Sequence, residues 1–201
     1  MPTVLIHEEV AYNIAKKYQE LDNKDFYLGA LAPDSVNLNG FAPKEVRWTS
    51  HLRKENLDEW LEKVKEFYNE NKNKYNKYFL LGYVLHIITD IVYDNYFYQN
   101  IRNEMTKDNI NENDQHPLLR KYMEEYSYLV ENNHIRNYIK ELLNDHLGYN
   151  IRNIIKEDMI SWKDLCLKEY QKDIIPNKYI TKSHIIELTK KTEEIFKTFI
   201  I

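Results

Sequence analysis

The segment from Tyr78 to Tyr93 is the feature that most constrains the fold of this chain. It is apolar on nearly every side of a helix, and its main interruptions are His86, Thr89 and Asp90. A helix of this kind is normally either a membrane span or the central helix of a bundle. Sixteen residues that include a histidine and an aspartate make a poor span. The segment therefore predicts a buried helix with other helices packed around it.

The remaining hydrophobic residues also recur at helical intervals of three and four. Residues 29–43 contain two glycines and two prolines and are expected to form a loop, and residues 103–116 are expected to be a polar connection. No segment alternates with a period of two. The spacing predicts helices over residues 7–21, 57–68, 75–102, from 117 to about 130, 134–147, 161–172 and 183–199.

These patterns predict an all-α fold, a single-domain bundle of several helices around the buried central one. The domain is expected to span residues 1–201, with the chemically suggestive motifs in residues 1–102 and a helical completion of the bundle in residues 103–201. A chain of 201 residues is of ordinary length for one domain.

Charge and cysteine content exclude several kinds of protein. The chain has 28 Lys and Arg against 32 Asp and Glu, a net charge of −4, and so lacks the basic footprint of a protein that binds duplex nucleic acid. Its single cysteine, Cys166, excludes an internal disulfide and a cysteine-rich zinc module. The first residues show no secretory signal, so the cytoplasm is the expected compartment, without stable membrane association.

His86 and Asp90 are the first candidates for chemistry. They are four residues apart, which places both side chains on one face of the most apolar helix, where they could hold one ion. A lone carboxylate in such surroundings is costly and needs a partner. A structural His–Asp hydrogen bond, or pairing of the aspartate with a distant arginine, would also meet that need.

Three further candidates lie upstream. His7 lies on the apolar face of the first helix, Asp34 follows Pro33, which stiffens the approach to it, and His51 precedes an amphipathic helix. Each also has a plain interpretation, as a residue at a helix start, a turn residue and a surface histidine respectively. Their order in the chain is what makes them informative together.

The series His7, GALAPD (29–34), TSH (49–51) and GYVLHIITD (82–90) resembles the zinc-dependent phospholipase C superfamily, which includes fungal single-strand nucleases and bacterial hydrolases. The resemblance covers about the first half of the chain. It implies that Asp34, His51, His86 and Asp90 hold one zinc ion, and that His7 binds a neighbouring zinc which Asp90 bridges. Mixed histidine and carboxylate ligands suit zinc or a similar transition metal better than calcium or magnesium.

The chain departs from that family in two places. In secreted members the free N-terminus completes the site of the early histidine, whereas six residues precede His7 here. Those members also bind another zinc through a later histidine and a His-x-x-x-Glu/Asp pair, which is missing from this sequence. Asp94, one turn beyond Asp90, could replace a histidine ligand, while His146 is expected to be a core histidine. We therefore expect one or two ions.

The resemblance implies a metal-dependent hydrolase of phosphate esters with metal-bound water as the nucleophile. Asp34 is the expected acceptor of the water's proton, and a small soluble phosphoester is the expected substrate. One alternative is a non-catalytic binding or regulatory protein with a structural or degenerate metal site. Another is a helical phosphohydrolase with adjacent His-Asp ligands, but the chain contains no His-Asp dipeptide.

Overall fold

The fold is all-α, as the periodicity predicts. The computed structural model describes residues 1–168 and 177–200, and within them the only β-structure is an isolated bridge between Ile151 and Ile154. The α-helices of these residues are α1 (Val4–Lys17), α2 (Lys24–Leu31), α3 (Lys44–Ser50), α4 (Leu57–Asn71), α5 (Lys77–Val92), α6 (Tyr98–Lys107), α7 (Glu112–Ser127), α8 (Asn133–Leu143), α9 (Lys156–Cys166) and α10 (Lys182–Ile200).

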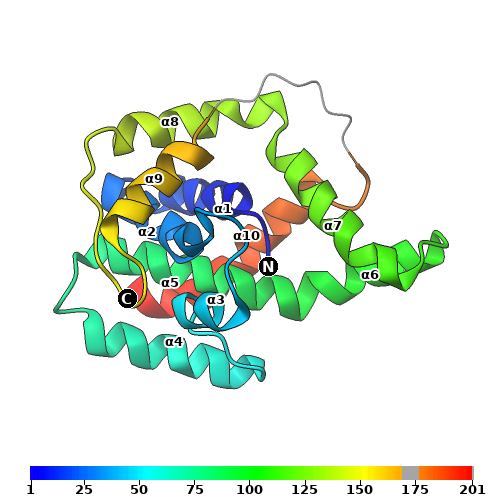
Figure 1. Cartoon of the computed structure of the whole chain (residues 1–201), viewed down its shortest axis with the longest axis horizontal. Helices are drawn as coiled ribbons and strands as arrows, with labels where there is room; N and C mark the ends of the chain where they lie inside the picture. Colours follow the sequence, from blue (N-terminus) through cyan, green and yellow to red (C-terminus); the bar gives the residue numbers. More distant parts are fainter. Residues whose placement is uncertain (169–176, 201) are drawn as a thin grey trace.

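Helix α5 is the centre of the bundle (Figure 1). Every residue from Phe79 to Val92 is buried, and α1, α2, α4 and α10 all pack against this helix. The side chain of Asn76 accepts hydrogen bonds from the backbone N–H groups of Tyr78 and Phe79, which caps the helix at its first turn. The prediction of a buried central helix is therefore confirmed.

The expectation of a loop over residues 29–43 is wrong for its first part. Helix α2 runs through Gly29, and the 3-10 helix η2 (Ala32–Asn37) follows directly. Gly29 allows α2 to cross α5 closely, because a Cβ atom there would lie 2.1 Å from the carbonyl oxygen of Phe79. Gly82 has the same role from the α5 side, where a Cβ atom would lie 2.0 Å from the carbonyl oxygen of Phe26. Both glycines are packing residues of helices.

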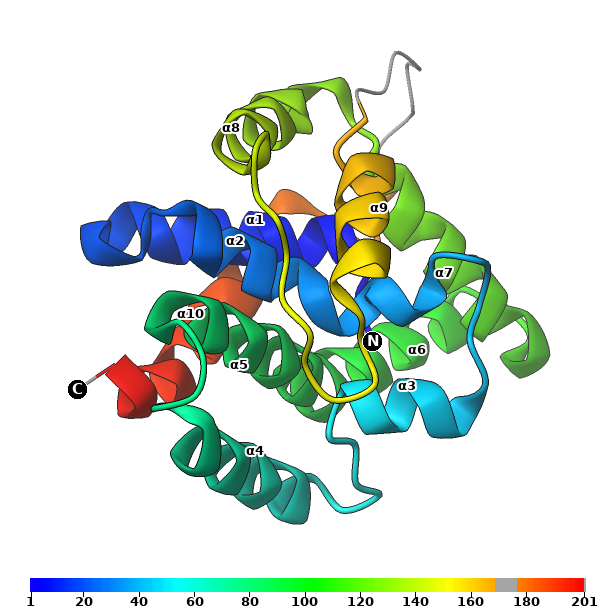
Figure 2. The ribbon, with the colours of Figure 1, turned by 60° about the vertical axis from the view of Figure 1, so that its left-hand side comes forward.

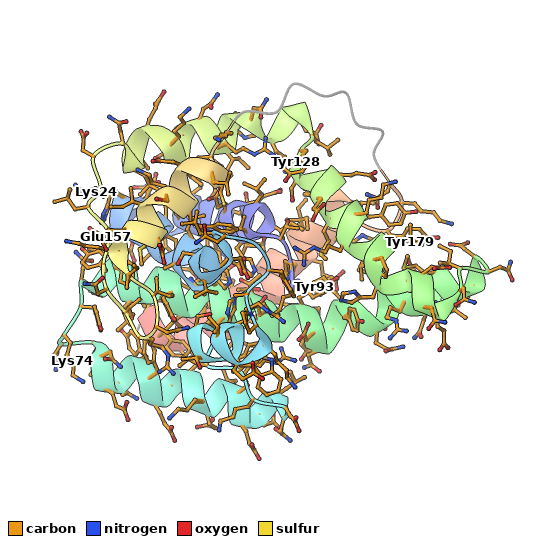
Figure 3. The ribbon with its side chains drawn as sticks, viewed as in Figure 1. Lys24, Lys74, Tyr93, Tyr128, Glu157 and Tyr179 are labelled. Carbon is orange, nitrogen blue, oxygen red and sulfur yellow. The ribbon has the colours of Figure 1, made fainter. Side chains whose placement is uncertain are left out.

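The chain continues past α5 through a π-helical turn, η3 (Tyr93–Phe97), into α6, so that the two helices form one long element in Figure 1. Tyr93, labelled in Figure 3, is buried where the turn begins. The predicted polar connection over residues 103–116 is too long at both ends. Helix α6 extends to Lys107, and Asn111 caps α7, which therefore begins before Pro117.

The C-terminal half of the described chain closes the bundle. Helices α8 and α9 pack against α2, and α10 packs against α5 and α1. Helix α9 begins earlier than expected, and residues 169–172 of the predicted helix lie outside the described residues. Glu193 of α10 accepts hydrogen bonds from Lys17 and Tyr18 at the end of α1. Among the described residues, no helix has the length and apolar character needed to cross a membrane.

Candidate metal centre

Five of the predicted site residues converge at the middle of α5. They come from α1 (His7), η2 (Asp34), the residue that ends α3 (His51), and α5 itself (His86 and Asp90). Two sets of three ligand atoms lie within 4.8 Å of one another, His7 with Asp34 and His86, and His51 with His86 and Asp90. All five side chains are buried. Residues far apart in the sequence thus form one cluster of three imidazoles and two carboxylates.

Asp90 lies between the histidines, with each carboxylate oxygen facing a different side. Its Oδ1 atom is 3.3 Å from Nε2 of His7, and its Oδ2 atom is 3.8 Å from Nε2 of His51 and 3.9 Å from Nε2 of His86. The side chain is fully buried, and neither oxygen has a hydrogen-bond partner within the part of the chain that the structure describes. Such a carboxylate requires a compensating cation.

The tautomers of His86 and His51 can be assigned from their backbone contacts. Nδ1 of His86 lies 2.6 Å from the carbonyl oxygen of Ala30, and Nδ1 of His51 lies 2.9 Å from the carbonyl oxygen of Arg47. Because a carbonyl oxygen only accepts, each Nδ1 carries the proton. In the neutral form each Nε2 then presents a lone pair, and these two atoms face each other at 3.3 Å. A cation between or beside them would satisfy both.

The pKa shifts of His86, Asp34 and Asp90 favour the protonation states in which these residues bind a metal. The rings of His7 and His86 stack with centroids 3.6 Å apart, so charge on both would be unfavourable. Burial, reinforced by His7, lowers the pKa of His86 to about 3. Burial alone would raise the pKa values of Asp34 and Asp90, but the neighbouring histidines hold both below their ordinary range. In contrast, these carboxylates raise the pKa of His51 against the effect of its burial.

Asp34 connects the cluster to solvent. It is the one member of the five that lines a pocket of about 780 Å³, which α3, α6, α7, α9 and the N-terminal residues also border. Its Oδ1 atom accepts a hydrogen bond from Asn37 at 3.3 Å and lies 3.4 Å from Nε2 of His51. Its Oδ2 atom has no hydrogen-bond partner in residues 1–168 or 177–200, so this oxygen is available to a ligand or a water molecule.

Asp94 is the predicted ligand that the structure does not bring to the cluster. It accepts a hydrogen bond from Arg53, and its Oδ1 atom lies 3.5 Å from the N-terminal amine of Met1. The prediction assumed a regular α-helix after Asp90. The π-helical turn begins at Tyr93, and its wider winding changes the direction of the side chains that follow. Asp94 lines the pocket beside the cluster instead.

Sequence reasoning did not identify the groups that orient the histidines. These are the carbonyl oxygens of Ala30 and Arg47 and the hydroxyl of Ser50, whose Oγ atom lies 2.9 Å from Nδ1 of His51. A backbone carbonyl has no signature in the sequence. His146 follows the end of α8 at a separate position in the fold, where its side chain is 7% exposed and its Nε2 atom lies 2.9 Å from Oδ1 of Asp25.

Comparison with known proteins identifies one family. The family model described as zinc dependent phospholipase C matches residues 6–153, a range that contains all five residues of the cluster. No curated protein and no solved structure gave a match.

Proposed function

The chain belongs to the zinc-dependent phospholipase C family, and from that membership we propose a zinc-dependent hydrolase of phosphate esters. His7, Asp34, His51, His86 and Asp90 would hold one or two zinc ions. The two groups of ligand atoms share His86, and Asp90 offers one oxygen to each side. This arrangement supports a bridging role for Asp90.

The observation that carries the proposal is the pair of Nε2 atoms of His51 and His86, 3.3 Å apart beside two buried carboxylates. Histidine ligands bind metals in the neutral form, with the second ring nitrogen donating to a carbonyl or carboxylate. Both rings have the required contact of Nδ1 with a backbone carbonyl oxygen. A proton shared by the two rings is the other cation that would satisfy them, and metal analysis separates these two possibilities.

Zinc, when bound by such ligands, lowers the pKa of a coordinated water and stabilises the negative charge that develops on a phosphoryl group. The protein groups do the positioning. Ala30 and Arg47 fix the orientation of His86 and His51 through their carbonyl oxygens. Asp34 faces both the cluster and the pocket, so its Oδ2 atom can accept a hydrogen bond from the attacking water and receive its proton.

We propose a small soluble phosphoester as the substrate. The pocket volume of about 780 Å³ lies in the range of sites for small molecules. The net charge of −4 argues against duplex nucleic acid as a partner. The cytoplasm remains the compartment that we propose, with no stable membrane association.

Metal content and hydrolysis, measured on the same preparations, test the proposal. Protein purified without chelators or a metal-affinity tag is compared with His86→Ala and with a matched control, His146→Ala. This control also removes a histidine with a largely covered side chain, 7% exposed, but at a position apart from the cluster. We expect one or two equivalents of zinc in the wild type and the control and none in His86→Ala. Phosphomonoesters and phosphodiesters are then screened for zinc-dependent hydrolysis.

Three outcomes are informative. Loss of both zinc and hydrolysis in His86→Ala alone supports the proposal. Bound zinc without hydrolysis of any ester favours the alternative of a binding or regulatory protein with a structural metal. No zinc in the wild type, and none taken up from solution, contradicts the proposal and leaves a shared proton between His51 and His86.

A further inference from the structure

Two arginines meet over one exposed aromatic ring at the edge of the pocket. The guanidinium carbon of Arg47 lies 3.9 Å from the ring centroid of Phe41, and that of Arg120 lies 4.9 Å from it. The two guanidinium carbons are therefore at most 8.8 Å apart. Arg47 belongs to α3 and Arg120 to α7, and Phe41 lies in the segment between η2 and α3, which passes α7 in Figure 2.

This arginine pair carries positive charge with little compensation. Arg47 uses its Nε atom to donate to the carbonyl oxygen of Ala42 at 2.9 Å, and no carboxylate of the described residues forms a salt bridge with it. Arg120 donates from Nε to Glu124 at 3.3 Å, a contact between two exposed side chains. Exposed pairs of this kind contribute little. Within the described residues, no carboxylate accepts a hydrogen bond from the terminal N–H groups of either arginine.

The third arginine of the pocket provides a contrast. Arg53 donates to Asp94 and stacks on the ring of Trp60 at 4.0 Å, so its charge is already compensated. Burial lowers the pKa of Arg47, and the positive charge of Arg120 lowers it further, against the attraction of Asp34. Arg47 therefore lies close enough to Asp34 and to Arg120 for both of their charges to change its pKa.

Planar guanidinium groups bind phosphate oxygens through paired N–H donors, which makes arginine pairs suited to doubly charged phosphate. We propose that Arg47 and Arg120, with Phe41 as their platform, form a second phosphate-binding site in the pocket, and that the substrate carries a phosphate group there besides the one that is hydrolysed. The part of this inference that concerns the substrate rests on the proposed function. The part that concerns phosphate binding rests only on the two arginines.

The depth of the pocket supports two separate phosphate positions. Asp34, a member of the candidate metal cluster, is buried, whereas the side chain of Arg120 is 52% exposed. Both line the same pocket, so one phosphate group would occupy its inner end and the other its outer part. A bisphosphorylated small molecule has this arrangement of charge.

Binding of inorganic phosphate to metal-free protein tests the site without requiring catalysis. Isothermal titration calorimetry is carried out on His86→Ala and on chelator-treated wild-type chain, so that a failure of one protein to fold leaves the other. In each, Arg47→Gln and Arg120→Gln are compared with Lys121→Gln, which removes a neighbouring exposed charge of α7 that lies outside the pocket.

We expect Arg47→Gln and Arg120→Gln each to weaken phosphate binding about tenfold, and Lys121→Gln to weaken it by less than twofold. Equal phosphate affinity in all the variants would overturn the inference. This result is independent of hydrolysis. A chain that binds phosphate through both arginines but cleaves no ester would contradict the proposed function and retain the phosphate site.

The source of the phosphate group is resolved by two further titrations on zinc-loaded wild type and Arg120→Gln. Fructose 1,6-bisphosphate is compared with fructose 6-phosphate, and phosphatidylcholine vesicles with 20% phosphatidic acid are compared with pure phosphatidylcholine vesicles. Arginine-dependent preference for the bisphosphate supports a soluble substrate, and arginine-dependent binding to the phosphatidic acid vesicles supports a lipid headgroup. Absence of both effects would overturn the inference that the substrate carries a second phosphate group.

Discussion

The close crossing of α2 and α5 is expected to couple the stability of the fold to metal binding at the candidate centre, and Gly82→Ala tests this coupling. The new methyl group would lie 2.0 Å from the carbonyl oxygen of Phe26, a backbone atom that cannot rotate away. An ordinary contact requires the helices to separate by about 1.4 Å. Overpacking of this kind costs about 3 kcal/mol in the free energy of unfolding. For a domain of this size we expect a fall in Tm of about 6–12 °C.

The same displacement should weaken zinc binding. The carbonyl oxygen of Ala30 lies on α2, 2.6 Å from Nδ1 of His86, and Asp34 follows α2 directly. Moving α2 outward breaks the contact that orients His86 and carries Asp34 away from the cluster. Loss of such orienting contacts typically weakens metal affinity by about 10–100-fold. Thermal denaturation by circular dichroism and competition with a zinc chelator measure the two effects on the same protein.

Gly40→Ala is the matched control for this experiment. A Cβ atom at Gly40 would meet nothing within 4 Å, but the residue has a φ of +109° that disfavours alanine. We expect a stability loss of about 1 kcal/mol without a change in zinc affinity. Wild-type Tm in Gly82→Ala would refute the packing argument, and a lowered Tm with unchanged zinc affinity would refute the coupling.

Three further substitutions test single contacts. Asp34→Asn keeps the shape of the side chain but cannot accept a proton, so kcat is expected to fall at least about 100-fold, and wild-type turnover would exclude the role proposed for it. Ser50→Ala removes one of two contacts to Nδ1 of His51 and is expected to weaken zinc binding by up to about tenfold in chelator competition. For Glu193, burial acts to raise the pKa, but hydrogen bonds led by that of Lys17 hold it at about 2, below its ordinary 4.5. Glu193→Gln is therefore expected to cost about 1 kcal/mol at pH 7, a difference that fades between pH 4.5 and 2 in urea denaturation, and equal stability at pH 7 would contradict it.

The parts of the fold that depend on hydrophobic spacing could be predicted from the sequence. The run from Tyr78 to Tyr93 has only one stable environment in water, the interior of a bundle, and α5 occupies it. The ends of helices were harder to predict, because they depend on which side chain caps the first turn. Asn111 begins α7 ahead of Pro117, the residue that the sequence marked as a helix start.

Glycine was the main source of error in the fold. The two glycines and two prolines of residues 29–43 predict a loop, whereas the structure uses the lack of a side chain at Gly29 for close packing of two helices. The two roles cannot be distinguished without knowing which helix crosses at that point. The π-helical turn that separates Asp94 from the cluster is a similar case, since the local sequence YDNYF carries no pattern that predicts an extra residue in the turn.

The candidate site shows the same division. His7, Asp34, His51, His86 and Asp90 could be selected because their residue types and order resemble a known family, and the structure brings all five together. The contacts of Ala30 and Arg47 were beyond prediction because any residue can supply a carbonyl oxygen. The pairing of Arg47 with Arg120 depends on the approach of α7 to the segment before α3, a contact between distant parts of the chain.

The burial of α5 on all sides has a consequence for synthesis of the chain. The ribosome releases α1, α2, α4 and α5 long before α10, which begins at Lys182 and covers part of α5. Until α10 emerges, the most apolar helix of the chain exposes one side to water, a condition that promotes aggregation of partly made chains. The five cluster residues are all present by that stage, since the last of them is Asp90. An ion captured by the nascent chain would hold α1, η2, α3 and α5 together while α10 is still inside the ribosome.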